Sequence, residues 1–357
     1  MGASRQIKVG ILTAPHIDFE QREHTFILRN VRIGIGFHWD RLEDQEFAGQ
    51  LEIIQSQELK ANSQEPLYTA VNTIDLEDYL CSVISSEMNA NSPMELLKAH
   101  AVISRSWAIR AIEKPNHEGY HVCADDHCQR YEGLYRMNER AVQAVRETAG
   151  QVLINDKGTK EEICDCRYYK CCGGRSEVWR TCWEDIDVPY IQSVECPYCG
   201  KAVHRPSILR TVLNNYDQET KDFHDWQVTY TAEELSDIVR EKSGIDFGTI
   251  TDLIPLKRGV SGRIYELKIV GTKRTEIIGK ELKIRLWLSR TCLYSSWFEV
   301  RKSIQHSVVS FQLIGHGWGH GAGLCQIGAA VMADEGFKYK QILAHYYVGT
   351  RIGVAAL

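Results

Sequence analysis

Glycine occupies every second position from residue 315 to residue 323, and this run restricts the fold more than any other feature of the sequence. Alternating glycines let the backbone adopt positive φ and approach another group closely, so the run predicts a tight loop. Its two histidines, His316 and His320, offer hydrogen-bonding nitrogens near neutral pH and are candidate ligand-binding residues. A purely structural loop with hydrogen-bonded histidines is the alternative. The run lacks the endings typical of phosphate loops and dinucleotide-binding turns.

The overall composition excludes several classes of protein. The 357 residues are 43% hydrophobic and 25% charged, with a formal net charge of −5. Such a chain forms one large globular domain or two ordinary ones, and its charge does not favour nucleic acid or anionic lipid. No apolar run approaches the ~18 residues of a membrane-spanning helix. Since the start of the sequence has no apolar segment of the signal-peptide kind, either the protein is cytosolic or a targeting or anchor segment lies outside this sequence.

Hydrophobic periodicity predicts an α+β fold with a mixed, mainly antiparallel sheet and several packed helices. Residues 5–74 alternate short β-type runs with polar turns. Asp75 is a credible N-cap for a first helix, and Ser92 and Glu95 form a capping-box pattern for a second helix that runs to about residue 114. Further expected elements are helices at 138–149, 232–242 and 324–335, a strand at 151–154 and a hairpin at 263–278.

A carboxylate, Glu87, follows the apolar stripe of the first predicted helix. The apolar residues between 76 and 84 recur at helical spacing, and Glu87 is the next position of that series. Desolvation at the end of a buried stripe disfavours the charged form of a carboxyl, which suits a general acid. If the helix ends near residue 86, Glu87 points to solvent instead.

Histidine and cysteine crowd the segment from residue 117 to residue 128. Thiolate sulfur and imidazole nitrogen are the ligands that tetrahedral Zn²⁺ prefers, so His117 or His121 could join Cys123, His127 and Cys128 in one site. With four protein ligands the zinc would be structural. A disulfide from either cysteine in an oxidising compartment is the alternative.

A second stretch of the chain is also rich in cysteine. A Cys-x-x-Cys pair is a weak signal alone, but its neighbours strengthen the interpretation as disulfides or an additional structural metal. Redox catalysis is not expected, since no thioredoxin-like βαβ pattern surrounds the pair. The cysteines of this stretch are Cys164, Cys166, Cys171, Cys172, Cys182, Cys196 and Cys199.

Several short motifs occur in a fixed order along the chain, and together they resemble one family. They are DLEDYL at 75–80, SEM at 86–88, LKAHAV at 97–102 with SR at 104–105, GG at 173–174, PYI at 189–191, SGR at 261–263, GHG at 319–321 with Gln326, and HYY at 345–347 with GT at 349–350. This pattern closely resembles the stage II sporulation protein D (SpoIID) and LytB family. The resemblance covers about residues 7 to 352.

That resemblance implies a peptidoglycan lytic transglycosylase acting on denuded glycan strands. The family's catalytic acid corresponds here to Glu87. It would protonate the glycosidic oxygen between N-acetylmuramic acid and N-acetylglucosamine and then act as base on the muramoyl C6 hydroxyl. The product would be a 1,6-anhydro end. A non-catalytic wall-binding protein that enhances an amidase is the alternative, because LytB-type relatives are described so.

Other expectations follow from the same resemblance. Arg105, Tyr169, His320 and Gln326 would position the substrate, and family spacing favours His117 in the zinc site. The protein would be exported to the cell envelope, with glycan strands and an N-acetylmuramoyl-L-alanine amidase as partners. We expect one continuous SpoIID-like unit made of a β-rich part (5–74), a part with the catalytic helices and metal-binding residues (75–204) and an α/β part with the glycine run (205–357).

A third hypothesis concerns Cys325, which lies near the start of a predicted helix. A thiolate there, activated by His316 or His320, would make a Cys/His hydrolase. The family often has serine at this position, so a small buried cysteine is the favoured interpretation.

Overall fold

The computed structural model describes seven stretches of the chain. They are residues 5–35, 40–56, 65–125, 127–156, 161–212, 223–306 and 308–355. These stretches contain helices together with several mostly antiparallel sheets, which confirms the predicted α+β class.

The elements alternate between short strands and helices along the chain. The strands are β1 (Gln6–Ala14), β2 (Phe19–Gln21), β3 (Thr25–Ile33), β4 (Arg41–Ala48), β5 (Gln50–Gln55), β6 (Tyr68–Asp75), β7 (Val122–Cys123), β8 (Gln151–Asn155), β9 (Glu162–Ile163), β10 (Tyr168–Tyr169), β11 (Asp225–Thr231), β12 (Ile250–Arg258), β13 (Ile264–Gly271), β14 (Thr275–Ile278), β15 (Phe298–Gln305), β16 (Val308–His316), β17 (Leu324–Cys325) and β18 (Arg351–Val354). The helices are α1 (Leu76–Glu87), α2 (Met94–Glu113), α3 (Glu139–Glu147), α4 (Trp179–Cys182), α5 (Pro197–Val203), α6 (Pro206–Val212), α7 (Ala232–Ser243), α8 (Glu281–Trp287), α9 (Gln326–Asp334) and α10 (Tyr339–Tyr346).

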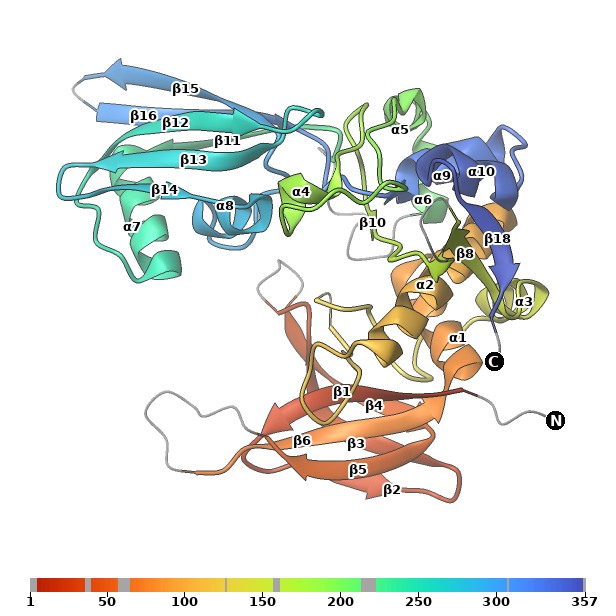
Figure 1. Cartoon of the computed structure of the whole chain (residues 1–357). Coiled ribbons are helices and arrows are strands. Elements are labelled where there is room, and N and C mark those ends of the chain that lie inside the picture. Colours follow the sequence, from red (N-terminus) through yellow and green to blue (C-terminus); the bar gives the residue numbers. More distant parts are fainter. Residues whose placement is uncertain are drawn as a thin grey trace.

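Two sheets lie at the N-terminal end of the molecule, and their strands β1–β6 are drawn in red and orange in Figure 1. Their strand orders are β5-β6-β1-β7 and β2-β3-β4, and every pair is antiparallel except β1 with β7. Phe26 and Phe47 alternate inward from β3 and β4 and stack at 5.5 Å between ring centroids. Strand β6 continues directly into α1, so the apolar interior of these sheets is continuous with the helical core.

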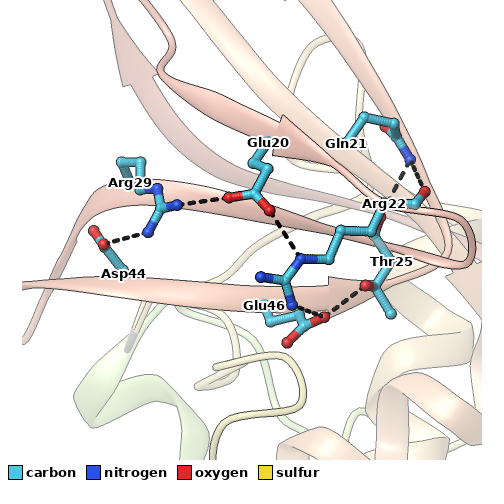
Figure 2. Close-up of polar contacts among 7 residues, drawn as sticks. All are labelled: Glu20, Gln21, Arg22, Thr25, Arg29, Asp44 and Glu46. Atoms are coloured by element: carbon cyan, nitrogen blue, oxygen red, sulfur yellow. Dashed lines mark hydrogen bonds and ion pairs between the residues drawn. The ribbon is translucent and has the colours of Figure 1, made fainter.

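The outer face of the sheet β2-β3-β4 carries a network of ion pairs (Figure 2). Glu20 accepts hydrogen bonds from both Arg22 and Arg29, and these arginines also pair with Glu46 and Asp44. The hydrogen bond from Arg29 holds the pKa of Asp44 below its usual range. All these side chains are well exposed, so water and salt screen the pairs and each adds little to stability. The charges also discourage pairing of the sheet's edge strands with other chains.

The first two helices define the position of the candidate acid. The Asp75 carboxylate accepts the backbone N–H groups of Glu77 and Asp78, as expected of an N-cap. The capping box expected at Ser92 is not formed, because the Ser92 hydroxyl donates instead to the carbonyl of Thr211 at 3.0 Å. Helix α2 therefore begins without a side-chain cap.

Among the described residues, no helix is long and apolar enough to cross a bilayer.

Two hydrophobic cores organise the chain. The first takes buried residues from between 7 and 223 and again from between 322 and 347, and the second takes residues between 226 and 313. Helices α9 and α10 return to pack on α2, and β18 pairs with β8, so the end of the chain lies beside its first half (Figure 1). Residues 205–357, expected to form one part, thus contribute to both cores.

The second core lies between two three-stranded sheets and two helices. The strand orders are β11-β16-β15 and β12-β13-β14, with α7 and α8 packed against them. The predicted hairpin at 263–278 is present as β13 and β14. Helix α7 begins with a capping box between Thr231 and Glu234 and ends at Gly244 in the left-handed conformation. The glycine run then leads from β16 back to β17 in the first core.

Candidate functional site

Glu87 is the last residue of α1, and its carboxyl group faces the protein interior. Its side chain is buried, with 9% of the residue exposed. The Oε1 atom accepts the backbone N–H of Arg130 at 3.0 Å and the hydroxyl of Tyr168 at 2.9 Å. The helix thus continues through Glu87, which removes the alternative that this carboxyl points to solvent. Two donors hold the group in one orientation.

Tyr168 connects Glu87 to the glycine run. It lies on β10, which pairs in parallel with β17, so residues 168 and 324 are neighbours. While the Tyr168 hydroxyl bonds Glu87, its carbonyl accepts the Nε2–H of His320 at 3.0 Å. The other ring nitrogen of His320 accepts the N–H of Ala322. Burial and the nearby arginines, led by Arg167, lower the pKa of His320 well below its ordinary value, so the ring is neutral.

Gln326 approaches the same place through His100. The Gln326 side-chain amide donates to His100 Nε2 at 3.1 Å, and the His100 ring lies 4.3 Å from the Tyr168 ring between centroids. Burial, assisted by the positive charge of Lys170, lowers the pKa of His100 to about 3. Neutral His100 thus lies between Gln326, which bonds it, and the ring of Tyr168, against which it packs. Sequence reasoning missed His100 as a site residue, although it lies inside the motif at 97–102.

The sequence prediction selected Tyr169, but the structure brings Tyr168 to the acid. Adjacent residues of a strand point to opposite sides, so only one of the two tyrosines can face Glu87. Tyr169 is 4% exposed, and its ring packs against His320 at 5.4 Å between centroids. Burial, reinforced by nearby cysteines, raises the pKa of its hydroxyl. Tyr169 therefore supports the histidine from the interior and offers no surface to a substrate, which corrects its expected role.

Arg105 is also corrected from a substrate contact to an interior brace. Its side chain is completely buried. The guanidinium binds both carboxylate oxygens of Glu77 at 2.6 and 2.7 Å and donates to the carbonyls of Gln151 and Val145. One buried fork thus ties together α1, α2, α3 and β8. With no exposed atoms, Arg105 cannot contact a glycan strand.

His316 lies apart from His320, although both come from the same run. Its Nδ1 binds Asp225 Oδ1 at 2.6 Å, and the other oxygen of Asp225 binds His224 at 2.6 Å. The pairing follows from sheet register, because His316 on β16 lies opposite Asp225 on β11. His316 therefore belongs to a separate charged group, and the structure does not join it to Glu87.

The glycine run approaches the protein closely rather than leaving space for a ligand. At Gly319, φ is +101°, and a Cβ atom there would lie 2.8 Å from the Cβ of Tyr169. At Gly323, φ is +92°, and a Cβ would collide with the carbonyl of Arg167. Positive φ and the lack of side chains let the run lie directly against residues 167–172. The expected close approach is present, but its partner is the chain itself.

Arg167, Trp183 and His320 pack together next to Tyr169 and form a half-buried surface. The Arg167 guanidinium lies 5.0 Å from the Trp183 ring centroid and binds Asp165 with two hydrogen bonds. Trp183 in turn packs edge-on against His320 at 4.8 Å between centroids. A hollow of about 550 Å³ lies along α3, but none of these side chains lines it. Flat rings and a fixed cation suit the apolar faces and hydroxyl groups of a sugar.

The predicted histidine and cysteine residues come together in one group, which we call the His/Cys group (His117, Cys123, His127 and Cys128). Their candidate ligand atoms all lie within 4.8 Å of one another. His117 Nε2 is 3.2 Å from Cys128 Sγ, and His127 Nδ1 is 3.5 Å from the same sulfur. These residues could hold a metal ion.

Two further observations concern the His/Cys group. His121 lies outside it, because its Nδ1 accepts the backbone N–H of Lys8 at 2.9 Å. Interaction with Cys128, and then with His127, lowers the pKa of Cys123 to about 4, whereas the same interaction raises the pKa of Cys128. The pair therefore releases one proton readily, and a divalent cation would stabilise the second thiolate.

The His/Cys group leads directly to the candidate acid. The segment returns from Cys128 through Gln129, whose side-chain oxygen accepts the Tyr79 hydroxyl, to Arg130, whose N–H binds Glu87. Arg130 is only two positions beyond Cys128, with the single residue Gln129 between them. Fixing Cys128 therefore fixes one of the two donors that orient the carboxyl.

A second set of four residues, the cysteine group (Cys172, Cys196, Cys199 and Cys325), lies elsewhere in the structure. Its four sulfurs lie within 4.8 Å of one another, and all four residues are buried. The hypothesis of a Cys325 nucleophile fails here, because its sulfur is fully buried beside other cysteine sulfurs rather than at a histidine. All twelve cysteines are free thiols in the structure.

Comparison with known proteins identifies a family and several relatives to which this chain is similar. Residues 64–155 match a family model described as Stage II sporulation protein, and residues 177–323 match a domain of unknown function. An uncharacterized protein of Brachyspira hyodysenteriae is 30% identical over 283 residues, covering 79% of this chain and 67% of that protein. Stage II sporulation protein D of Bacillus subtilis is 24% identical over 311 residues, covering 81% and 79% of the two chains. The Amidase enhancer of B. subtilis is 26% identical over 305 residues, covering 76% of this chain and 40% of that protein. The ordered motifs, the matching segment that carries Glu87 and these relatives together show that the chain belongs to the SpoIID family.

Proposed function

We propose that the protein is a lytic transglycosylase that cleaves bonds between N-acetylmuramic acid and N-acetylglucosamine, with Glu87 as the general acid and base. One observation carries the proposal: Glu87, buried at the end of α1, shares the single residue Tyr168 with the histidine of the glycine run. A carboxyl that donors hold in one orientation can give or take a proton at a fixed position. The family relationship points to the same class of substrate.

The reaction needs only one carboxyl group. Protonated Glu87 donates its proton to the glycosidic oxygen, the bond to the muramoyl C1 breaks, and the N-acetylglucosamine hydroxyl leaves. The resulting carboxylate takes the proton of the C6 hydroxyl as O6 bonds to C1, which closes the 1,6-anhydro ring and restores the acid. No water is consumed. The Arg130 N–H and the Tyr168 hydroxyl keep the carboxyl in place throughout both steps.

The half-buried surface formed by Arg167, Trp183 and His320 is the proposed binding surface for the glycan. Trp183 offers a ring face, Arg167 a cation held by Asp165, and His320 an edge fixed by the Tyr168 carbonyl. Gln326 is 2% exposed and acts from behind, through His100. Denuded glycan strands are the proposed substrate, as the family resemblance implies.

We further propose that the His/Cys group holds a structural Zn²⁺. Two thiolates and two imidazoles within reach of one ion fit tetrahedral zinc, and all four positions would be filled by the protein. The ion supplies a cross-link in the segment that follows β7. This cross-link holds the Arg130 N–H against Glu87 and takes no part in bond cleavage.

The second candidate function is enhancement of an amidase without catalysis, favoured by the relative named Amidase enhancer. In that case the half-buried surface would bind glycan, and Glu87 would only contribute to its shape. Either function places the protein in the cell envelope, with peptidoglycan as its partner.

Product analysis separates these functions. The protein is incubated with denuded glycan strands, and the products are examined by mass spectrometry for 1,6-anhydromuramoyl ends. We expect such ends from the parent and from Glu139→Gln, an exposed control with the same chemical change, and none from Glu87→Gln. Equal activity of Glu87→Gln and the parent would remove the assigned acid.

The amidase function needs its own measurement. Here the release of stem peptides by an N-acetylmuramoyl-L-alanine amidase is followed with and without the protein. Stimulation that survives in Glu87→Gln, together with a parent that makes no anhydro ends, would establish the enhancer in place of the enzyme.

A further inference from the structure

We propose that the cysteine group (Cys172, Cys196, Cys199 and Cys325) is a second metal site, which binds one Zn²⁺ through four thiolates. The group draws on three distant segments: the loop after β10, the start of α5, and the junction of β17 with α9. All four residues have 0% exposure. Neither the family match nor the named relatives assign a metal here, and the site lies apart from the His/Cys group.

The spacing of the sulfurs fits a single ion. With Zn–S bonds of about 2.3 Å, a tetrahedral site separates its sulfurs by about 3.8 Å. The four sulfurs lie within 4.8 Å of one another, and those of Cys172 and Cys199 are 3.2 Å apart. Small side-chain adjustments therefore reach the tetrahedral distance. A cluster of several iron atoms would stand between its cysteines and hold their sulfurs further apart.

Hydrogen-bond donors surround these sulfurs as they surround thiolate ligands. The N–H groups of Cys172 and Gly328 point at Cys325 Sγ, each at 3.3 Å. The N–H of Gly174 points at Cys172 Sγ at 3.4 Å. A neutral thiol is a weak acceptor, whereas a thiolate is a strong one, so these buried donors are best satisfied when the thiols are ionised.

Glycine makes room for the sulfurs at one contact. A Cβ atom on Gly328 would lie 2.6 Å from Cys196 Sγ and 3.2 Å from Cys325 Sγ, so any side chain there would push the group apart. The hydroxyl of Tyr346 lies on the same side, next to the Gly328 Cβ position and 3.2 Å from Cys196 Sγ. Gly328 and Tyr346 thus pack directly against the sulfurs of the group.

The site would act as a cross-link behind the proposed active site. Cys172 follows Cys171, which forms a two-way backbone bridge with Trp318, and Cys325 lies two positions after the last glycine of the run. An ion bound to both Cys172 and Cys325 therefore holds the glycine run against the segment that follows β10, the strand that carries Tyr168. Binding exchanges up to four thiol protons for one Zn²⁺ and requires no oxidant or reductant.

Metal analysis of the full-length purified protein tests the proposal. We expect about two zinc ions per chain in the parent and in Cys81→Ser, a control at a buried cysteine outside both groups. Cys123→Ser/Cys128→Ser should lose one zinc and keep the other. Cys172→Ser/Cys199→Ser should lose the other. Zinc that disappears completely from Cys123→Ser/Cys128→Ser, while this variant remains folded, would overturn the second site.

A spectroscopic measurement tests the site without substituting its four cysteines, so it does not depend on whether variants of the cysteine group fold. Cobalt(II) is substituted for zinc in folded Cys123→Ser/Cys128→Ser, where the cysteine group is the remaining candidate metal site among the described residues. An intense thiolate-to-cobalt absorption band typical of four sulfur ligands supports the site. Its absence, iron in place of zinc in the purified protein, or a non-reduced mass showing these four cysteines as disulfides would each contradict it.

Discussion

The two candidate metal sites of this protein are built in opposite ways. The His/Cys group closes a short segment, since His117 and Cys128 are 11 residues apart, and it is partly exposed. The cysteine group joins residues as much as 153 positions apart and is completely buried. A local group shapes one loop, whereas a non-local group holds distant parts of the fold together. The difference predicts that the first mainly affects activity and the second mainly affects stability.

The largest expected effect is the loss of the non-local cross-link. Constraining a loop of 153 residues stabilises a fold by about 5 kcal/mol through the entropy of the unfolded chain, against about 3 kcal/mol for a loop of 11 residues. With zinc present, we expect Cys172→Ser to lower the free energy of unfolding by more than Cys128→Ser does. Urea denaturation measures both, with Cys81→Ser as the control for removing a buried thiol. Equal losses would mean that the two groups do not differ as cross-links.

The next effect sharpens the other half of the comparison. In Cys128→Ser the segment after β7 loosens, and the Arg130 N–H no longer holds Glu87. We expect kcat/KM for anhydro-end formation to fall about 100-fold, which corresponds to about 2.7 kcal/mol. The assay is run where the variant is still folded by circular dichroism. A folded Cys128→Ser with unchanged kcat/KM would show that the His/Cys group does not position the acid.

The same contrast explains what the sequence could predict. The residues of the His/Cys group are close in the sequence, so their type and spacing predicted the set that the structure brings together, and only the choice between His117 and His121 needed coordinates. The cysteine group depends on the folding of three segments, and no local pattern selects Cys172 and Cys325 from the twelve cysteines. The sequence therefore indicated Cys172, Cys196 and Cys199 only as part of a larger cysteine-rich stretch, and the structure selected these three and added Cys325.

Side-chain direction set a second limit on sequence reasoning. Helical spacing correctly carried α1 to Glu87, because periodicity is a local property. The choice between Tyr168 and Tyr169 depends on which face of β10 meets α1. The sequence also does not indicate that Arg105 is buried and paired with Glu77. Burial and strand facing are decided by tertiary packing, so these roles required the structure.

A smaller effect concerns low pH. It weakens both proposed metal sites by protonating their ligands, and it destabilises the fold separately through His100. Its pKa is lowered to about 3 by burial and by Lys170, with Tyr168 and Gln326 also in contact. Because the unfolded chain binds this proton below a pKa of about 6.5, stability falls as the pH falls below that value. We expect the parent to lose about 2 kcal/mol more than His100→Asn between pH 7 and pH 5.

Urea denaturation of both proteins at the two pH values measures this difference. Metal-site protonation is common to both proteins and cancels in the comparison. If His100→Asn shows the same pH dependence as the parent, His100 is not the group that titrates, and acid acts on this region through the metal ligands alone.

The smallest expected effect comes from the ion pairs on the outer face of β2-β3-β4. Glu20→Gln removes the carboxylate shared by Arg22 and Arg29, yet all three side chains are well exposed. Water replaces the lost contacts, so the thermal midpoint should change by less than about 2 °C, and kcat/KM should not change. Differential scanning calorimetry at low and high salt measures the midpoint. A clear fall in the thermal midpoint or in kcat/KM of Glu20→Gln would mean that even an exposed change in the N-terminal sheets affects the whole fold. Losses of stability or activity in the cysteine variants could then not be assigned to the loss of a metal cross-link.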